Sequence, residues 1–304
     1  MGHRKDANTC LPWHGGRSSA MGRRHFSIWI VSPPGYLNSR CFEEVAQGLR
    51  AAFAELGFDA PVITEPAKIQ DYAIVLGANL LATARGELPC RLILYNLEQI
   101  QKNSHWLKPE YIDLLRRYPV WDYSMRNIEA LKDYGIMNAA LCGIGYMPAL
   151  TCFRPASEDL DVVFFGTMNP RRKGVLDQIA ESGKHVKTGF NIYGKERDAL
   201  YARAKIVLNM HVFEAQIFEI VRVSYLLANR KCVVSETGRD SGLEEPLRGG
   251  IAFAPYNDLA GTCLRLLEQE DERARLAAQG FELFSAHSQV PMLKRALETL
   301  HHTA

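Results

Sequence analysis

A cluster of three cationic residues follows a short apolar run in the second half of the sequence. The run at residues 161–165 has the character of a buried strand, and Gly166 follows it directly. Arg171, Arg172 and Lys173 come next, just before a stretch with helical spacing. Glycine lets the backbone approach a ligand closely, helix amino-termini attract anions, and arginine binds two phosphate oxygens at once. This order predicts a phosphate-binding site, and the alternative is an exposed basic turn at a helix start.

A second group of polar residues follows the expected strand at 205–210. His211 lies one residue beyond this strand, and Glu219 and Arg222 lie farther along, one helical turn apart. Because strands of a parallel sheet point their carboxyl ends at the ligand crevice, these side chains are candidates for ligand contacts. Glu219 and Arg222 form either an ordinary ion pair on a helix or a pair in which Glu219 orients Arg222 toward an anion. His211 is either a structural histidine or a contact to a sugar or nucleobase.

Two carboxylates occupy similar places in the first half of the chain. Glu98 follows the expected strand at 91–95, and Asp122 lies at the end of the strand segment 120–123. A carboxylate at such a position acts as a general base toward a hydroxyl group when its pKa suits the working pH. Glu98 is therefore a candidate base and Asp122 competes with it. The alternative for Glu98 is a cap or an ion pair with a neighbouring cation.

Strand and helix patterns alternate along both halves, which predicts parallel sheets covered by helices on both faces. In the first half we expect strands at 26–32, 61–64, 72–76, 91–95, 120–123 and 139–142, and helices at 41–56 and 109–117. In the second half we expect strands at 161–165, 185–189, 205–210, 231–235 and 251–254, and helices at 174–182, 195–204, 217–229, 259–268, 271–286 and 290–300. The fold class is thus α/β, with two Rossmann-like doubly wound domains and a cleft between them.

The domain boundaries follow from where this alternation lapses. Residues 1–24 are polar and rich in glycine and basic residues, so we expect a disordered leader there. We assign the first domain to residues 25–150 and the second to residues 151–286. A final helix within 287–304 is expected to return to the first domain.

The composition disfavours several classes of protein. Thirty-six Lys and Arg residues against 34 Asp and Glu residues leave a net charge of +2, which gives no argument for binding nucleic acid or an anionic membrane. No apolar run approaches the roughly 18 residues that span a bilayer, and residues 1–24 lack the apolar segment of a signal peptide. The seven cysteines are dispersed, so we expect reduced thiols in a cytoplasmic protein and no metal site.

The order of strand, glycine, cationic cluster, second strand and acidic helix entry resembles the donor-binding half of GT-B glycosyltransferases. The resemblance is nearest to the CgeB-like sequences and to those called glycosyl transferases group 1. In that family a strand of the second domain ends in a glycine, as at Gly166 here. An Arg or Lys shortly after it reaches the diphosphate of a nucleotide-sugar, and Arg172 or Lys173 occupies that place.

The resemblance also implies roles for the second polar group. An acidic residue in this region bonds the ribose or sugar hydroxyls of the donor, and Glu219 is the first candidate and Glu214 the second. Arg222 would then lie beside the diphosphate. The E-x7-E spacing of the retaining members is missing, because Tyr225 stands where the second Glu belongs.

The resemblance implies a metal-independent, hexosyltransferase-like enzyme that uses a nucleotide-diphosphate sugar as substrate and needs no cofactor. The first half would face an acceptor that the sequence does not identify. The alternative is a protein that binds a nucleotide or nucleotide-sugar in a degenerate GT-B site without catalysis. A nicotinamide-dependent enzyme is disfavoured, because no G-x-G-x-x-G fingerprint follows the strand at 26–32.

Overall fold

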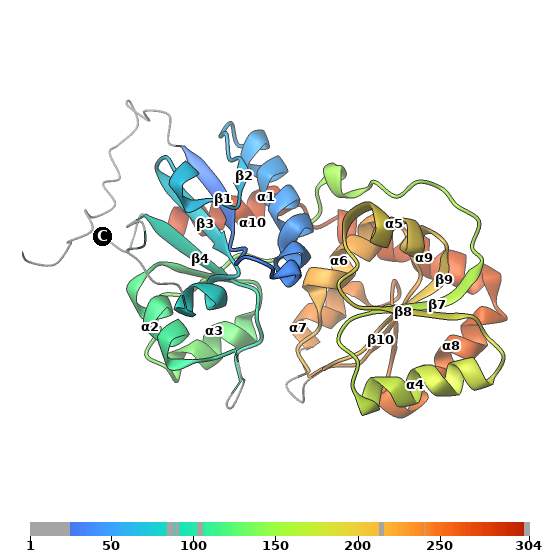
Figure 1. Ribbon diagram of the computed structural model, residues 1–304. Helices are drawn as coiled ribbons and strands as arrows, with labels where there is room; N and C mark the ends of the chain where they lie inside the picture. Colours follow the sequence, from blue (N-terminus) through green and yellow to red (C-terminus); the bar gives the residue numbers. More distant parts are fainter. Residues whose placement is uncertain are drawn as a thin grey trace, which may run out of the picture.

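Two parallel sheets, one in each half of the chain, organise the computed structural model (Figure 1). It describes residues 25–83, 88, 91–101, 106–212, 216–239 and 241–300, so the leader expected at 1–24 lies outside the described residues. The first sheet has the order β2-β1-β3-β4-β5-β6 and the second has the order β11-β10-β9-β7-β8. Neighbouring strands are parallel throughout both sheets. The predicted α/β class is confirmed.

The first sheet is covered by helices on both faces, so β1 and β4 are buried along their whole length. Its strands are β1 (Phe26–Ile30), β2 (Val62–Ile63), β3 (Tyr72–Leu76), β4 (Leu92–Asn96), β5 (Val120–Asp122) and β6 (Ala140–Leu141). One face packs against α1 (Glu43–Glu55) and α10 (Gln289–Thr299). The other face packs against α2 (Pro109–Arg117) and α3 (Met125–Lys132).

The second sheet is built in the same way. Its strands are β7 (Leu160–Phe165), β8 (Val186–Gly189), β9 (Ala204–Asn209), β10 (Val233–Glu236) and β11 (Ala252–Ala254). Helices α4 (Pro170–Glu181) and α8 (Leu259–Leu267) cover one face, and α5 (Gly194–Ala202) and α6 (Ile220–Ala228) cover the other. Helix α9 (Glu270–Ser285) packs against α6 and α8, and the short α7 (Ser241–Glu244) follows β10. In the part of the chain that the structure describes, no helix is long and apolar enough to cross a membrane.

The carboxyl-terminal segment connects the second half to the first. The backbone amide of Gly145 donates a hydrogen bond to Gln289 Oε1 at 2.7 Å, and Tyr146 and Ser288 form a parallel bridge. Helix α10 then lies beside α1 in the first half (Figure 1). Leu293 of α10 joins an apolar cluster that runs through both halves, so this segment ties them together.

Helix α4 begins at Pro170, earlier than the expected start at Gly174. The reason is a cap that the sequence analysis overlooked: the Asn169 side chain accepts a hydrogen bond from the Arg172 amide at 2.8 Å. Pro170 follows it at the start of the helix, where its missing N–H is no loss. The three cations therefore occupy the first turn of α4 and not the loop before it. The short helices α3 and α7 were also missed.

Candidate active site

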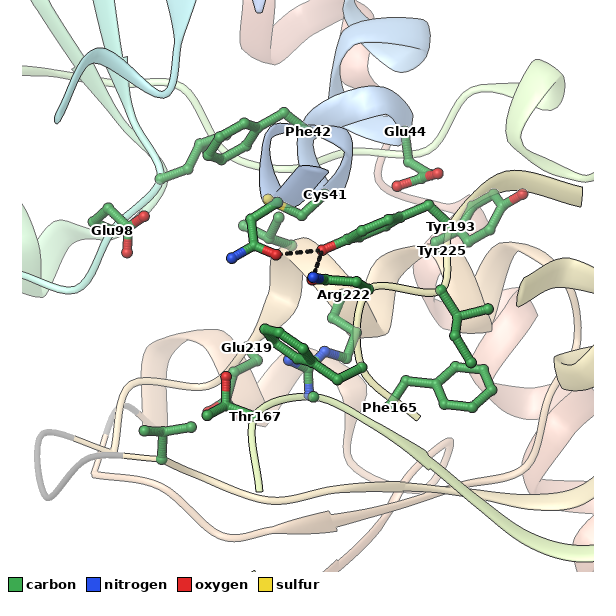
Figure 2. Close-up of a pocket in the computed structure, with 18 of the residues that line it drawn as sticks. Cys41, Phe42, Glu44, Glu98, Phe165, Thr167, Tyr193, Glu219, Arg222 and Tyr225 are labelled. Atoms are coloured by element: carbon green, nitrogen blue, oxygen red, sulfur yellow. Dashed lines mark hydrogen bonds between the residues drawn. The ribbon is translucent and has the colours of Figure 1, made fainter. Parts of the chain in front are cut away.

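A cavity of about 380 Å³ lies between the two halves and is lined by residues of both. Figure 2 shows Glu98, Phe42 and Cys41 on the side of the first half, with Arg222, Glu219 and Thr167 across from them. The carboxyl ends of β4 and β7 contribute to its walls, which is where parallel sheets place ligand sites. The described lining residues are Tyr36, Asn38, Cys41, Phe42, Glu44, Asn79, Leu80, Leu97, Glu98, Gln99, Trp106, Tyr123, Phe165, Gly166, Thr167, Arg172, Phe190, Asn191, Ile192, Tyr193, Arg197, Tyr201, Val212, Glu219, Val221, Arg222 and Tyr225.

Arg172 is the most deeply held cation of this cavity. Only 1% of the residue is exposed, and its guanidinium lies over the Phe164 ring, 5.1 Å from the ring centroid. Its Nη1 donates to the Thr167 carbonyl at 2.8 Å and its Nη2 donates to the Met210 carbonyl. Nε has no hydrogen-bond partner in the described structure. Carbonyl groups of the loop after β7 and of the residue after β9 thus hold this guanidinium, which forms no ion pair in the described structure.

Arg222 approaches the same point from the first turn of α6. A Cβ atom placed on Gly166 would lie 3.3 Å from Arg172 Nη1 and 3.6 Å from Arg222 Nη2. Both guanidinium groups therefore lie against Gly166, where the residue's lack of a side chain gives them room. The polar contact of Arg222 in the described structure is a long one, 3.5 Å from Nη1 to Asn209 Oδ1.

These two cations have no carboxylate in an ion pair with them in the described structure, and both lie at the positive ends of helices. Among the described residues, neither Arg172 nor Arg222 forms an ion pair with a carboxylate. Both belong to first turns of helices that carry no acidic residue there, so each meets the positive end of a helix dipole. Burial, together with the charge of Arg222, lowers the pKa of Arg172 to about 10. A bound anion would balance the positive charge of these two guanidinium groups.

The other two members of the cationic cluster point elsewhere, and neither is among the cavity-lining residues. Arg171 forms a bidentate ion pair with the buried Glu236 and stacks over Tyr256, 3.9 Å from the ring centroid. Lys173 is exposed and pairs with Asp177 at 2.6 Å along α4. All three cations were predicted from the sequence to be candidates for binding phosphate, and of the three only Arg172 lines the cavity.

Glu219 lies at the start of α6 and lines the cavity. The ion pair with Arg222 that we weighed as an alternative is not formed in the described structure. Instead, Oε1 of Glu219 is 2.9 Å from His211 Nδ1, and Oε2 accepts from Asn209 Nδ2 at 2.9 Å. Burial raises the pKa of Glu219, but His211, Arg222 and Asn209 outweigh that effect and lower it. The carboxylate is therefore ionised.

Glu98 and Asp122 differ sharply in their surroundings. Glu98 lines the cavity, and its Oε1 has a weak contact at 3.5 Å with Asn79 Nδ2. Burial raises its pKa to about 7. Asp122 is fully buried behind the wall and accepts hydrogen bonds from Asn96, from Asn127 and from the backbone amide of residue 124. Burial raises the Asp122 pKa to about 7 as well, although those donors act in the opposite direction.

The structure also adds residues that the sequence analysis did not name. Arg197 of α5 bonds Glu44 of α1 at 2.7 Å, so an ion pair with little exposure spans the two halves at the cavity wall. Nearby, the Tyr193 hydroxyl donates to Asn38 Oδ1 at 3.3 Å (Figure 2). Each pair joins residues more than a hundred positions apart, and no local pattern connects them.

Three further expected residues have different outcomes. Tyr225 lines the cavity, and its hydroxyl donates to Asp198 Oδ2 at 3.1 Å and lies 3.0 Å from Cys152 Sγ. Glu214 lies outside the described residues. His211 is buried but is not among the residues lining the cavity. Across the described ranges, no group of three or more His, Cys, Asp and Glu side chains is arranged to hold a metal ion.

The chain was compared with family models and with curated proteins. No family model matches the chain. Two curated relatives from Acanthamoeba polyphaga mimivirus, the uncharacterized proteins L140 and R358, are each 29% identical to it. They match over 58% and 60% of this chain, which spans 59% and 64% of their own lengths.

Solved structures match over nearly the whole chain. Anabaena Alr3699/HepE in complex with UDP-glucose has a TM-score of 0.58 at 16% identity, covering 91% of this chain and 99% of that one. Sucrose-phosphate synthase from Thermosynechococcus elongatus has a TM-score of 0.60 at 12% identity, covering 93% and 100%. The glycosyltransferase AviGT4 has a TM-score of 0.57 at 14% identity, covering 91% and 97%. The chain has the GT-B fold. The narrower CgeB-like resemblance stays a prediction.

Proposed function

We propose that this protein is a glycosyltransferase that binds a nucleotide-diphosphate sugar in the cleft and transfers the sugar to an acceptor hydroxyl. The observation that carries the proposal is the pair Arg172 and Arg222, which meet at Gly166 with no carboxylate partner in the described structure. HepE, a neighbour with the same fold, binds UDP and UDP-glucose, which supports a donor of that chemical class.

The two arginines stabilise the leaving group. As the bond between the anomeric carbon and the diphosphate oxygen breaks, negative charge grows on the departing nucleoside diphosphate. Fixed guanidinium groups and the amino-terminal amides of α4 and α6 offset that charge. In this proposal Arg172 and Arg222 stabilise the charge on the diphosphate, as a divalent cation does in metal-dependent enzymes, so transfer is metal-independent. Lys173 and Arg171 take no part in binding phosphate.

Glu98 is the proposed general base. It takes the proton of the acceptor hydroxyl while that oxygen attacks the anomeric carbon, and the sugar leaves the diphosphate for the acceptor. Its pKa of about 7 makes it partly ionised and still basic near neutral pH. Asp122 is held by three hydrogen bonds behind the wall, so we assign it the structural role of fixing the β4 and β5 strand ends.

Calorimetric titration with UDP, GDP, ADP and dTDP tests the donor site. We expect one diphosphate to bind, and Arg172→Ala to abolish that binding. Lys173→Ala is the matched control, because it removes the next cation of the same helix turn without touching the cavity. Thermal unfolding of Arg172→Ala checks that its fold persists. Failure of all four diphosphates to bind the wild-type protein would refute the proposal. Binding without product formation from any nucleotide-sugar would instead support the non-catalytic alternative.

A further inference from the structure

His211 is buried directly behind the cavity wall. It is 1% exposed, and its ring contacts Glu219, which does line the cavity, at 2.9 Å through Nδ1. Its backbone amide donates to Glu236 Oε2 at 3.0 Å, which fixes the start of the turn after β9. Nε2 has no hydrogen-bond partner in the described structure. The His211 ring is therefore connected to the cavity only by its contact with the Glu219 carboxylate in the described structure.

The far edge of the ring is closed by the turn after β10. A Cβ atom on Gly238 would lie 3.2 Å from His211 Nε2 and only 2.3 Å from the Gln216 carbonyl oxygen, so a glycine is needed for the chain to pass here. The Gly238 amide donates to Glu244, and the Arg239 amide donates to the Gln216 carbonyl at 2.8 Å, so the turn is fixed on both sides. The Nε2 edge of the ring therefore faces this turn, and His211 is not among the residues lining the cavity.

Glu219 is held at both oxygens, by His211 at Oε1 and by Asn209 Nδ2 at Oε2. An ionised carboxylate has about four acceptor positions, so two such bonds leave capacity at each oxygen. Adjacent hydroxyl groups of a ribose or a hexose present two donors with a matching spacing. A carboxylate fixed from behind can thus accept both of them without paying the entropy of ordering its side chain.

The charges around His211 favour its protonated form. Burial alone lowers the pKa of His211, but the hydrogen bond and charge of Glu219, with the charges of Glu236 and Glu244, outweigh burial and raise it. Cations belong to the same network: Arg171 donates to the His211 carbonyl at 3.3 Å, Arg172 donates to the neighbouring Met210 carbonyl, and Arg222 contacts Asn209. The groups facing it thus come from α4, α6, α7 and β10.

We propose that His211 is a positioning residue: as an imidazolium it holds the Glu219 carboxylate from behind, so that Glu219 can accept hydroxyl groups of the bound donor. This inference rests on the proposed function and replaces the expectation that His211 itself contacts sugar or base.

A double-mutant cycle tests whether His211 acts through Glu219. The titrants are UDP and UDP-glucose. We expect His211→Ala to weaken binding about tenfold, the loss of roughly one charge-assisted hydrogen bond. In the Glu219→Gln background the same change should cause no further loss, because the group on which His211 acts is already neutral. His185→Ala, which alters an exposed histidine, is the control. Additive losses in the cycle would overturn the inference.

The pH dependence separates positioning from plain structural support. His211→Asn keeps an N–H donor near the place of Nδ1 but cannot titrate. Wild-type affinity should fall as the pH rises through the raised His211 pKa, above 6.5, and this fall should be absent in His211→Asn. In the ligand-free protein, NMR titration should find the His211 pKa above 6.5 in the wild type, and lower in Glu219→Gln than in the wild type, because the charge of Glu219 is one of the groups that raise it.

The outcomes distinguish this inference from the proposed function. A wild-type protein that binds neither UDP nor UDP-glucose, nor any other diphosphate, refutes the proposed function and the inference with it. A wild-type protein that binds, while His211→Ala binds equally well, refutes the inference alone. An effect on UDP would assign the hydroxyls to the ribose, and an effect on UDP-glucose only would assign them to the sugar.

Discussion

Replacing Arg222 by glutamine should separate ligand binding from stability. In the ligand-free protein Arg222 has one long polar contact, 3.5 Å to Asn209, and its guanidinium lies beside Gly166, as does that of the buried Arg172. Glutamine keeps a polar side chain at this place in α6 and removes the charge. Arg222 repels Arg172 but attracts the ionised Glu219, so the two electrostatic effects of its removal oppose each other and the melting temperature should change little.

The expected loss of affinity follows from the strength of the missing contact. A hydrogen bond to a charged group contributes about 1.5–3 kcal/mol. Loss of one such bond to a phosphate oxygen of the diphosphate raises Kd about 10- to 150-fold. The remaining Arg172 keeps the site partly cationic, so binding weakens but does not vanish.

Calorimetry with paired ligands measures this effect. The Kd of UDP, or of whichever diphosphate binds, is compared between wild type and Arg222→Gln, and the matching nucleoside without phosphates serves as the second ligand. We expect the variant to lose affinity for the diphosphate and to keep its affinity for the nucleoside. Equal losses for both ligands, or no loss for the diphosphate, would show that Arg222 does not contact phosphate.

Three other substitutions test separate parts of the site. Glu98→Gln should reduce the transfer rate about 10²- to 10⁴-fold while leaving donor affinity intact, as steady-state assays and calorimetry would show. Folding raises the Glu98 pKa from 4.5 to about 7. The contribution of the protonated Glu98 carboxyl to stability is therefore fully present below pH 4.5 and is lost as the pH rises through 7. Glu98→Gln should remove this part of the pH dependence of the melting temperature. Glu44→Ala should lower the free energy of unfolding by about 1–3 kcal/mol in urea titrations, because it removes a partner of the buried Arg197. Gly166→Ala should weaken diphosphate binding in calorimetry, because the added Cβ would lie 3.3 Å from Arg172 Nη1 at a backbone φ of 156°.

Matched controls make these tests specific. Glu43→Ala breaks an exposed ion pair with Arg40 one residue from Glu44, and it should cost less than about 1 kcal/mol. Gly261→Ala adds a methyl group within α8 where nothing lies within 4 Å, and it should not affect binding. Unchanged stability in Glu44→Ala would deny the cross-cleft ion pair any structural role. Full activity in Glu98→Gln would exclude that carboxyl as the base.

The strands could be predicted from the sequence because buried parallel strands are continuous apolar runs. Residues 72–76 and 161–165, for example, were expected as strands and match β3 and most of β7. The start of α4 was misplaced because it depends on a single capping side chain. Asn169 and Pro170 were interpreted as loop, whereas Asn169 accepts a hydrogen bond from the Arg172 amide and the helix begins at Pro170.

The site was only partly predictable, for two physical reasons. Successive residues of a helix point about 100° apart, so of the three consecutive cations one faces the cavity, and which one depends on a helix register that the misplaced start obscured. Contacts across the cleft join distant residues: Glu44 and Arg197 are 153 positions apart, and neither carries a local motif. Two carboxylates at strand ends were predicted, but only the structure shows that Glu98 lines the cavity, whereas Asp122 is buried and held by three hydrogen bonds.

The most direct test of glycosyl transfer is the release of nucleoside diphosphate from a nucleotide-sugar. Purified protein is incubated with UDP-glucose and with the sugars of any other diphosphate that binds, with water or a panel of hydroxyl compounds as acceptor. We predict diphosphate release by the wild-type protein, a slower reaction with Arg222→Gln, and almost none with Glu98→Gln. Tight diphosphate binding with no release from any donor and acceptor would contradict catalysis and leave a nucleotide-binding protein with the GT-B fold.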